Sequence, residues 1–216
     1  MGAKFMTSYK IHLLRTGSTQ ESTTRRCVGS LDAPLSPGGR SALEALARQA
    51  RYPQVERVYA SPLTRCLQST GIIYPGQAPQ PVQGLADMNL GAFEGRSIEE
   101  LQKDAAFARW LQDSQGNPPP GGEQVADFTQ RIVAAFNATV REMMRQKVTS
   151  AAVVTHGGVI MSLMAAVALP KAPLHDWAVA NGHGYTLLTS TQLWMQGGCA
   201  EAFATLPLHE TDEQFP

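Results

Sequence analysis

Short apolar runs alternate along this chain with segments in which apolar residues recur every three or four positions. The short runs predict strands, at residues 11–14, 55–60, 79–85, 151–155, 185–190 and 192–195. The run 151–155 is apolar throughout and is typical of a strand buried on both faces of a parallel sheet. Strands that alternate with helices therefore predict an α/β fold, with a mostly parallel sheet covered on both sides.

The longest helical pattern lies in the second half of the chain. Its apolar positions share helical spacing and are Val125, Phe128, Ile132, Phe136, Val140 and Met143. Two earlier helices are expected to begin at Ser36-Pro37 and Ser61-Pro62, with serine as the cap and proline at the first position. Residues 101–111 also have a helical pattern, and they precede a loop at 113–122 that is rich in proline and glycine. The last predicted helix begins at Gly157-Gly158 and ends before Pro170.

The net charge and composition of the chain argue against several classes of protein. The chain has 216 residues, 18 basic and 18 acidic, and a formal net charge of +0, so no overall field favours nucleic acid or an acidic membrane. It has no apolar stretch near the roughly 18 residues of a membrane span, and its three cysteines suggest neither a disulfide framework nor a zinc site. We expect a cytoplasmic protein with one domain at 9–210 and flexible ends at 1–8 and 211–216. Some of the first residues are expected to derive from cloning.

Three residues suited to binding a phosphate group follow predicted strands. Arg15 comes after the first strand, Arg65 lies in the first turn of the helix after the second, and His156 separates a strand from a helix. Ligands of open α/β sheets bind beyond the carboxyl ends of the strands. Arginine holds a phosphate dianion through paired donors, and helix N-termini favour anions. These positions predict a phosphate pocket at one sheet edge, whereas His12, inside the first strand, is expected in the core or in support of the site.

Six motifs in a fixed order resemble the histidine phosphatase superfamily, which includes the cofactor-dependent phosphoglycerate mutases. They are 14–19 (LRTGST), 29–36 (GSLDAPLS), 60–70 (ASPLTRCLQST), 85–95 (LADMNLGAFEG), 120–123 (PGGE) and 154–158 (VTHGG). The resemblance covers residues 11–188 and implies a three-layer α/β/α sandwich of the phosphoglycerate mutase type. The chain's length and the loop before PGGE are more similar to the phosphatase branch, particularly the alpha-ribazole phosphatases.

The resemblance also implies roles for individual residues. Arg15, Arg65 and His156 would form the phosphate pocket, with Ser22 and Gly157 contributing to phosphate binding. The general acid of the family is usually a glutamate, and the position matched by it here is Asp87. No metal and no cofactor are implied. The expected ligand is a small phosphorylated metabolite, and the sequence leaves the oligomeric state open.

Thr16 occupies the position at which the family has its nucleophilic histidine. A threonine hydroxyl is barely ionised at neutral pH and needs an adjacent general base to attack phosphorus. A phosphothreonine would also be a stable ester, so the second step of the reaction would stall. We therefore expect a phosphatase-type protein that is weakly active or inactive. The alternatives are a non-catalytic phosphate-ligand-binding or interaction protein on the same scaffold and, less favoured, a mutase.

Overall fold

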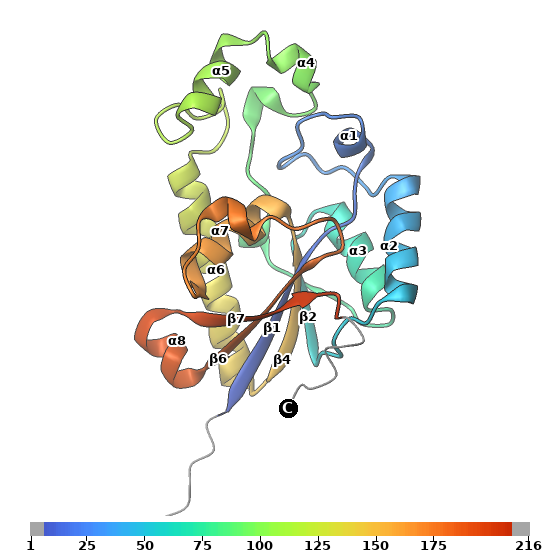
Figure 1. The fold of residues 1–216 in the computed structure, drawn as a ribbon, viewed down its shortest axis with the longest axis vertical. Helices are drawn as coiled ribbons and strands as arrows, with labels where there is room; N and C mark the ends of the chain where they lie inside the picture. Colours follow the sequence, from blue (N-terminus) through green and yellow to red (C-terminus); the bar gives the residue numbers. More distant parts are fainter. Residues whose placement is uncertain (1–6, 209–216) are drawn as a thin grey trace, which may run out of the picture.

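A sheet of seven strands runs through the centre of the part of the chain that the computed structural model describes, residues 7–208 (Figure 1). Its strands are β1 (Ser8–Arg15), β2 (Arg57–Ala60), β3 (Gln80–Pro81), β4 (Ser150–Thr155), β5 (Ala168–Leu169), β6 (Gly184–Ser190) and β7 (Ala200–Leu206). Their order is β3-β2-β4-β1-β6-β7-β5. Only β6 pairs antiparallel with its neighbours β1 and β7, and the other four pairings are parallel. The prediction of a mostly parallel sheet is confirmed.

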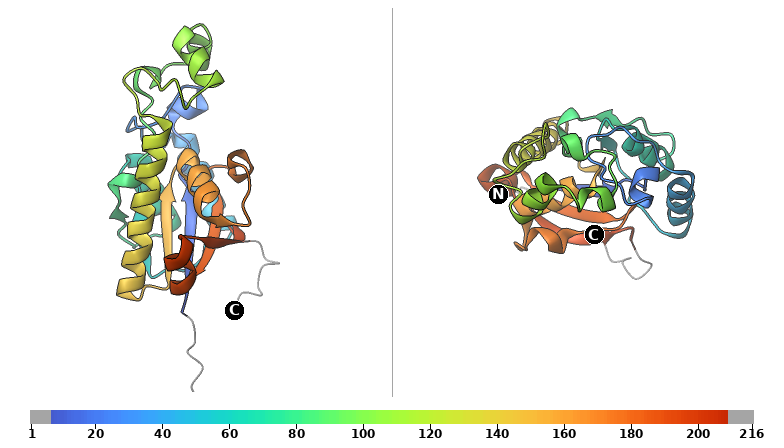
Figure 2. Two further views of the ribbon diagram at one scale, coloured as in Figure 1. Left: turned by 90° about the vertical axis from the view of Figure 1, so that its left-hand side faces the viewer. Right: turned by 90° about the horizontal axis from the view of Figure 1, so that it is seen from above.

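Helices cover both faces of this sheet, which confirms the three-layer prediction (Figure 2). The α-helices are α1 (Gln20–Thr23), α2 (Pro37–Gln49), α3 (Thr64–Ile73), α4 (Ile98–Leu101), α5 (Ala105–Gln112), α6 (Val125–Gln146), α7 (Gly157–Val167) and α8 (Thr191–Gly197). Three short 3-10 turns are η1 (Gln83–Leu85), η2 (Gly91–Phe93) and η3 (Leu174–Trp177). Helices α2 and α3 pack on one face of the sheet, and α6, α7 and α8 pack on the other.

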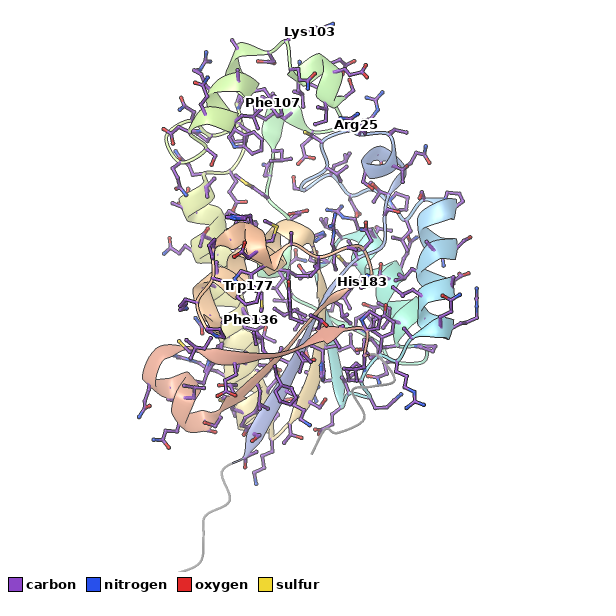
Figure 3. All side chains as sticks on the ribbon, in the orientation of Figure 1. Arg25, Lys103, Phe107, Phe136, Trp177 and His183 are labelled. Atoms are coloured by element: carbon purple, nitrogen blue, oxygen red, sulfur yellow. The ribbon has the colours of Figure 1, made fainter. Side chains whose placement is uncertain are left out.

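Alternate residues of the central strands pack into two separate hydrophobic cores, one on each face of the sheet. Ile11 and Leu13 of β1 pack with α6 and α7, whereas Leu14 points to the opposite face and packs with α2 and α3. A third, smaller cluster of Phe93, Leu101 and Phe107 lies beyond the end of the sheet. Figure 3 shows Phe107 well apart from Phe136 and Trp177 of the larger core.

The register of the three central strands places the predicted site at one edge. Arg15 pairs with Thr155 across β1 and β4, and Ala60 pairs with Val154 across β2 and β4. The carboxyl ends of these strands therefore lie side by side, as predicted from their spacing in the sequence. Helix α7 begins two residues after the end of β4, and α3 begins four residues after the end of β2.

The start of α3 differs from its prediction. Ser61-Pro62 does not cap this helix, which begins at Thr64 with Leu63 as its cap residue, and the Asp32 carboxylate accepts a hydrogen bond from the main chain of Thr64. Ser61 instead lies fully buried with its hydroxyl 2.8 Å from the imidazole of His156. The serine–proline signal was correct at α2, where Ser36 accepts a hydrogen bond from the main chain of Gly39.

Several other boundaries also differ. The segment 192–195 is helical in α8 rather than extended, because Ser190 caps the helix and Gly198 ends it with a φ of 60°. The predicted strand 79–85 shrinks to the two residues of β3 followed by η1, and β2 begins at Arg57. The helix expected over 101–111 is divided between α4 and α5, and Asp104 caps α5. The edge strand β5 and its neighbour β7 were not predicted.

The ends of the expected domain fall mostly outside the described residues. Residues 1–6 and the expected tail 211–216 lie beyond them, and β1 begins at Ser8, inside the segment expected to be flexible. Within residues 7–208, no helix is both long enough and apolar enough to cross a bilayer.

Candidate functional site

A cavity of about 70 Å³ lies at the carboxyl ends of β1 and β4. The seven residues proposed for the site from the sequence all line it: Arg15, Thr16, Ser22, Arg65, Asp87, His156 and Gly157. Four further residues complete the lining: Gly17, Thr19, Val28 and Asn181. The structure therefore brings the candidate residues together, from segments as far apart as β1 and α7.

Arg15 enters the cavity from the end of β1. Its Nη1 donates a 2.6 Å hydrogen bond to the main-chain oxygen of Val179, which fixes one end of the guanidinium. The guanidinium passes directly over Gly157, where an added Cβ would lie 3.2 Å from Nε of Arg15. Glycine at 157 thus permits the close approach of this cation to the start of α7. Burial lowers the pKa of Arg15 while Asp87 raises it, and an arginine remains charged under these conditions.

Arg65 is almost completely buried and its donors are already engaged by protein groups. Its Nη1 donates to the main-chain oxygen of Leu31 and its Nη2 to that of Gly29, both at 2.7 Å. Its Nη2 also lies 3.4 Å from Oδ2 of Asp87. Its Nε donates to His156, so four of its five N–H groups have protein partners, and a phosphate that accepts more than one hydrogen bond from Arg65 must replace some of them.

The loop that supplies those carbonyl oxygens is held by Glu94, which sequence reasoning missed. The Glu94 carboxylate accepts hydrogen bonds from the main chain of Gly29, Ser30, Leu31 and Leu90, and from the Ser30 hydroxyl. Five donors on one carboxylate fix residues 29–31 against η2. No local pattern in the sequence signals this role, because the groups that Glu94 binds at residues 29–31 lie more than 60 positions away along the chain.

His156 is the N-terminal cap residue of α7 and is almost completely buried. Its Nδ1 accepts a hydrogen bond from Nε of Arg65 at 3.2 Å, so the ring proton is assigned to Nε2, which donates to Ser61 at 2.8 Å. Burial is the main reason that its pKa lies well below the ordinary value, and the charges of Arg65, Arg131 and Arg15 add to this. The expected donation from His156 to a phosphate thus requires a second proton, which an arriving dianion would favour.

Asp87 follows η1, and its carboxyl group faces the Arg65 guanidinium and the His156 imidazole. Its Oδ2 lies 3.4 Å from Nη2 of Arg65 and 3.6 Å from Nδ1 of His156, and its Oδ1 accepts from the main chain of Met88. Burial raises the pKa of Asp87 to about 6, although Arg65 opposes that shift. A carboxyl group with this pKa can carry a proton at mildly acidic pH and pass it to a leaving group.

Thr16 turns its hydroxyl toward the first turn of α3. Oγ1 lies 2.9 Å from the main-chain oxygen of Arg65 and 2.9 Å from Oγ of Ser69, and a longer contact reaches the oxygen of Gly17. None of these groups can act as a general base toward the hydroxyl. The side chain is 5% exposed, so the hydroxyl is held in the protein's own hydrogen-bond network.

Ser22 and Asn181 border the cavity in different ways. The Ser22 hydroxyl belongs to the capping box of α1, where it accepts from the main-chain nitrogen of Thr19 and donates to its oxygen. Its proposed contact with phosphate remains a prediction. Asn181 was missed as a site residue, and its amide donates to the main-chain oxygen of Thr16 at 2.7 Å. His183, labelled in Figure 3, lines a separate cavity with residues of α2.

The family model for the histidine phosphatase superfamily (branch 1) matches residues 11–195, which is most of the chain. The chain belongs to the histidine phosphatase superfamily. The Adenosylcobalamin/alpha-ribazole phosphatase of Salmonella typhimurium is 26% identical over 202 residues, covering 91% of this chain and 94% of that protein. The Glucosyl-3-phosphoglycerate phosphatase of Mycobacterium tuberculosis is 29% identical over 188 residues, covering 83% of each chain.

The fold agrees with solved structures of this superfamily. The crystal structure of the alpha-ribazole phosphatase from Shigella flexneri superposes with a TM-score of 0.71 at 25% identity, covering 83% of this chain and 89% of that one. These similarities support a phosphatase or mutase-like function at the level of the superfamily.

A second, more apolar cavity adjoins the cavity at the ends of β1 and β4. It has a volume of about 380 Å³ and shares Arg15, Val28, Asp87 and Gly157 with the first. Its other lining residues are mostly apolar: Gly29, Met88, Leu90, Trp110, Val125, Phe128, Gly158, Met161, Ser162 and Leu174. Sequence reasoning did not find this cavity, because its walls come from η2, α5, α6, α7 and η3 and no single segment carries the pattern. Among residues 7–208, no group of three or more histidine, cysteine or acidic residues is arranged to hold a metal ion.

Proposed function

We propose that this chain binds a phosphomonoester in the cavity at the ends of β1 and β4 and hydrolyses it slowly or not at all. The observation that carries this proposal is the position of the Thr16 hydroxyl, which is bonded to the main chain of Arg65 and to Ser69. Arg15, Arg65 and His156 supply the charge and donors for the phosphoryl group. Their convergence supports phosphate binding independently of the residue at position 16.

The bound phosphate would rearrange its own cavity. Two carbonyl oxygens, of Gly29 and Leu31, accept hydrogen bonds from the Arg65 guanidinium. A dianion is a stronger acceptor than a neutral carbonyl and would replace them in part. The same negative charge favours protonation of His156, which then has a proton on each ring nitrogen and can donate to phosphate.

Without a phosphoenzyme, hydrolysis requires direct attack by water on phosphorus. The bond from water oxygen to phosphorus forms as the ester P–O bond breaks, and Asp87 gives its proton to the leaving alkoxide. The attacking water must pass a proton to a phosphoryl oxygen of the substrate itself, because the hydroxyl of Thr16 donates to the Arg65 main chain and is no base. Arg15 and Arg65 still hold the phosphoryl group, and Asp87 still acts as the general acid. We therefore expect turnover that is slow rather than efficient.

Binding without turnover is the second candidate function, and the same position of Thr16 favours it. The protein would then recognise a phosphorylated metabolite and report its presence to another process. A mutase is less favoured, because transfer of a phosphoryl group between positions requires a phosphoenzyme that persists.

The adjoining apolar cavity suggests the kind of alcohol that carries the phosphate. Trp110, Phe128 and Met161 line it beside Asp87, which would protonate the leaving oxygen. We infer a substrate or ligand with a bulky apolar alcohol portion. Relatives named for alpha-ribazole and for glucosyl-3-phosphoglycerate indicate that small phosphorylated metabolites are the relevant class.

One set of assays tests the proposal. Wild type, Thr16→His and Thr16→Val would be compared for hydrolysis of p-nitrophenyl phosphate and for an acid-labile phosphoenzyme. We expect little turnover in wild type and Thr16→Val, and a gain of at least about a hundredfold with phosphohistidine in Thr16→His. Because Asp87 is one methylene shorter than glutamate, Thr16→His combined with Asp87→Glu would be measured in parallel. Efficient turnover by wild type that survives Thr16→Val would overturn the proposal.

A further inference from the structure

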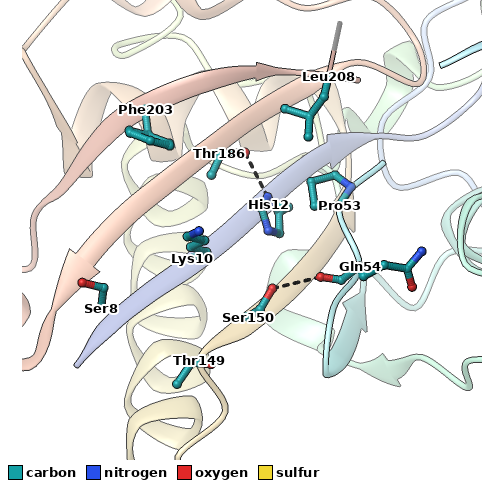
Figure 4. A pocket seen from close by; sticks show the side chains of 10 residues that line it. All are labelled: Ser8, Lys10, His12, Pro53, Gln54, Thr149, Ser150, Thr186, Phe203 and Leu208. Carbon is teal, nitrogen blue, oxygen red and sulfur yellow. Dashed lines mark hydrogen bonds between the residues drawn. The ribbon is translucent and has the colours of Figure 1, made fainter. Parts of the chain in front are cut away.

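A different cavity, lined by polar and apolar residues, lies along the amino-terminal half of β1. It shares no lining residue with the proposed phosphate cavity. Its volume is about 370 Å³, within the range of small-molecule sites, roughly 300–1,000 Å³. The central strands β1, β4 and β6 supply Lys10, His12, Ser150 and Thr186 to its wall (Figure 4). The position of these residues inside the sheet makes the cavity a fixed feature of the fold.

His12 is the unusual residue of this cavity. It is 3% exposed in a strand whose other buried neighbours are apolar, and it pairs directly with Thr186 across β1 and β6. Its Nδ1 lies 2.9 Å from Oγ1 of Thr186, but its Nε2 is buried without a hydrogen-bond partner. Buried polar atoms are almost always hydrogen-bonded, so an orphan nitrogen on a cavity wall indicates a missing partner.

The chemistry of the wall specifies what that partner should carry. Burial and the nearby charge of Lys10 lower the pKa of His12 to about 4, so the ring is neutral and Lys10 is the cation of the pair. If the Thr186 hydroxyl donates to Nδ1, then Nε2 carries the ring proton and can donate it to an acceptor. An anionic acceptor would interact with both Nε2 and the Lys10 ammonium group.

Three apolar residues also line this cavity. Pro53, Phe203 and Leu208 lie around the same cavity, and Phe203 is 39% exposed in spite of its large ring. Figure 4 shows Lys10 and His12 on β1, with Pro53 beside His12 and Phe203 and Leu208 across the strands. The cavity thus combines a cationic and hydrogen-bonding wall with an apolar one.

We propose that this cavity is a binding site for a small amphipathic carboxylate, separate from the phosphate cavity. Its carboxylate accepts a hydrogen bond from Nε2 of His12 and interacts with the Lys10 ammonium group. Its apolar body packs against Phe203, Pro53 and Leu208. The proposal is independent of the proposed phosphatase function, because none of these residues lines the catalytic cavity.

Calorimetric titration of the full chain with 3-phenylpropionate tests the site. We expect saturable one-to-one binding that is about tenfold weaker in Lys10→Gln and absent with the neutral 3-phenyl-1-propanol. Lys171→Gln is the matched control, because Lys171 is exposed, bonds only to the main chain of Ala166 in α7, and should leave the affinity unchanged. No saturable binding, or equal affinity in wild type and Lys10→Gln, would overturn the proposal.

A second measurement locates the ligand without relying on a variant that must fold. The ¹⁵N resonance of His12 Nε2 should shift on addition of 3-phenylpropionate, and saturating inorganic phosphate should not reverse the shift. The carboxylate would sit in the phosphate cavity instead if phosphate displaced it or if Arg65→Lys abolished its binding. Either of those results would refute the second site.

Discussion

Asp87 is the residue whose surroundings most directly set its chemistry. Its carboxyl group lies close to Arg65, yet burial outweighs that attraction and raises the pKa to about 6. The group is therefore largely protonated below pH 6 and largely ionised above pH 7. In the Thr16→His variant, turnover should rise as the pH falls from 8 toward 6, and Asp87→Asn should remove that rise. A pH profile that is the same with and without Asp87 would show that another group protonates the leaving oxygen.

The same shift predicts a stability effect. A pKa that is higher in the folded than in the unfolded state means that the folded carboxyl holds its proton more tightly. The stabilisation of the folded state by this bound proton is fully present below the pKa of the unfolded state, near pH 4. It is lost as the pH rises through about 6. Asp87→Asn should therefore raise the free energy of unfolding at pH 8 by up to about 2 kcal/mol and leave it unchanged near pH 3.5. Urea denaturation at both pH values measures this, with the exposed Asp176→Asn as the control.

Arg65 provides a test of phosphate recognition that does not depend on turnover. Lysine preserves the charge but lacks the planar fork of donors, so Arg65→Lys should weaken inorganic phosphate binding by about tenfold. Arg40→Lys alters an exposed arginine of α2 and should have no effect. Equal affinities in calorimetry for wild type and Arg65→Lys would exclude Arg65 from the phosphate site.

The contact between η2 and the loop 29–31 acts at the scale of elements. Glu94 does not line the phosphate cavity, but it fixes the loop whose carbonyl oxygens orient Arg65. Glu94→Gln replaces an anionic acceptor with a neutral amide. We expect a loss of about 1–3 kcal/mol in the free energy of unfolding and weaker phosphate binding. Glu99→Gln, on the exposed side of α4, is the matched control, and unchanged phosphate affinity in Glu94→Gln would contradict the positioning role.

Sequence patterns predicted best those elements whose burial is uniform along the segment. The strands β1 and β4 are buried on both faces, and α6 presents one apolar stripe, so hydrophobicity alone identifies them. The edge strands β3 and β5 have two residues each and carry no periodicity. The segment 192–195 was mistaken for a strand because its helix is specified by the cap at Ser190 rather than by its apolar residues.

The residues of the candidate site also differ in whether a sequence pattern predicts them. Arg15, Arg65 and His156 were predictable because each follows a strand, and parallel strands end at the same sheet edge. Glu94 and Asn181 act through hydrogen bonds to main-chain groups that are distant in sequence. Such contacts depend on how a loop returns to the sheet, and no local pattern of residues encodes that return.

For the whole molecule, the important division is between the two cores on the sheet and the small cluster beyond its end. Phe93 and Phe107 meet edge to face at 5.2 Å, and Trp110 packs beside them. Fewer apolar contacts hold this region, so α5 should open more often than α6. Hydrogen exchange should therefore be faster at residues 105–112 than at residues 128–143, and equal protection would show one cooperative unit.

The arrangement around Arg65 also bears on selectivity among anions. Carbonyl oxygens of the protein solvate this cation, so an anion that accepts several hydrogen bonds from Arg65 must compete with acceptors that the protein itself supplies. Halides and other weak acceptors lose that competition because they cannot replace two oriented oxygens at once. A dianion with several oxygens can, and the net heat it releases is the difference between two sets of hydrogen bonds. In the proposed phosphate site, selection among anions would therefore depend on their capacity for ligand exchange, before any contact with the apolar wall.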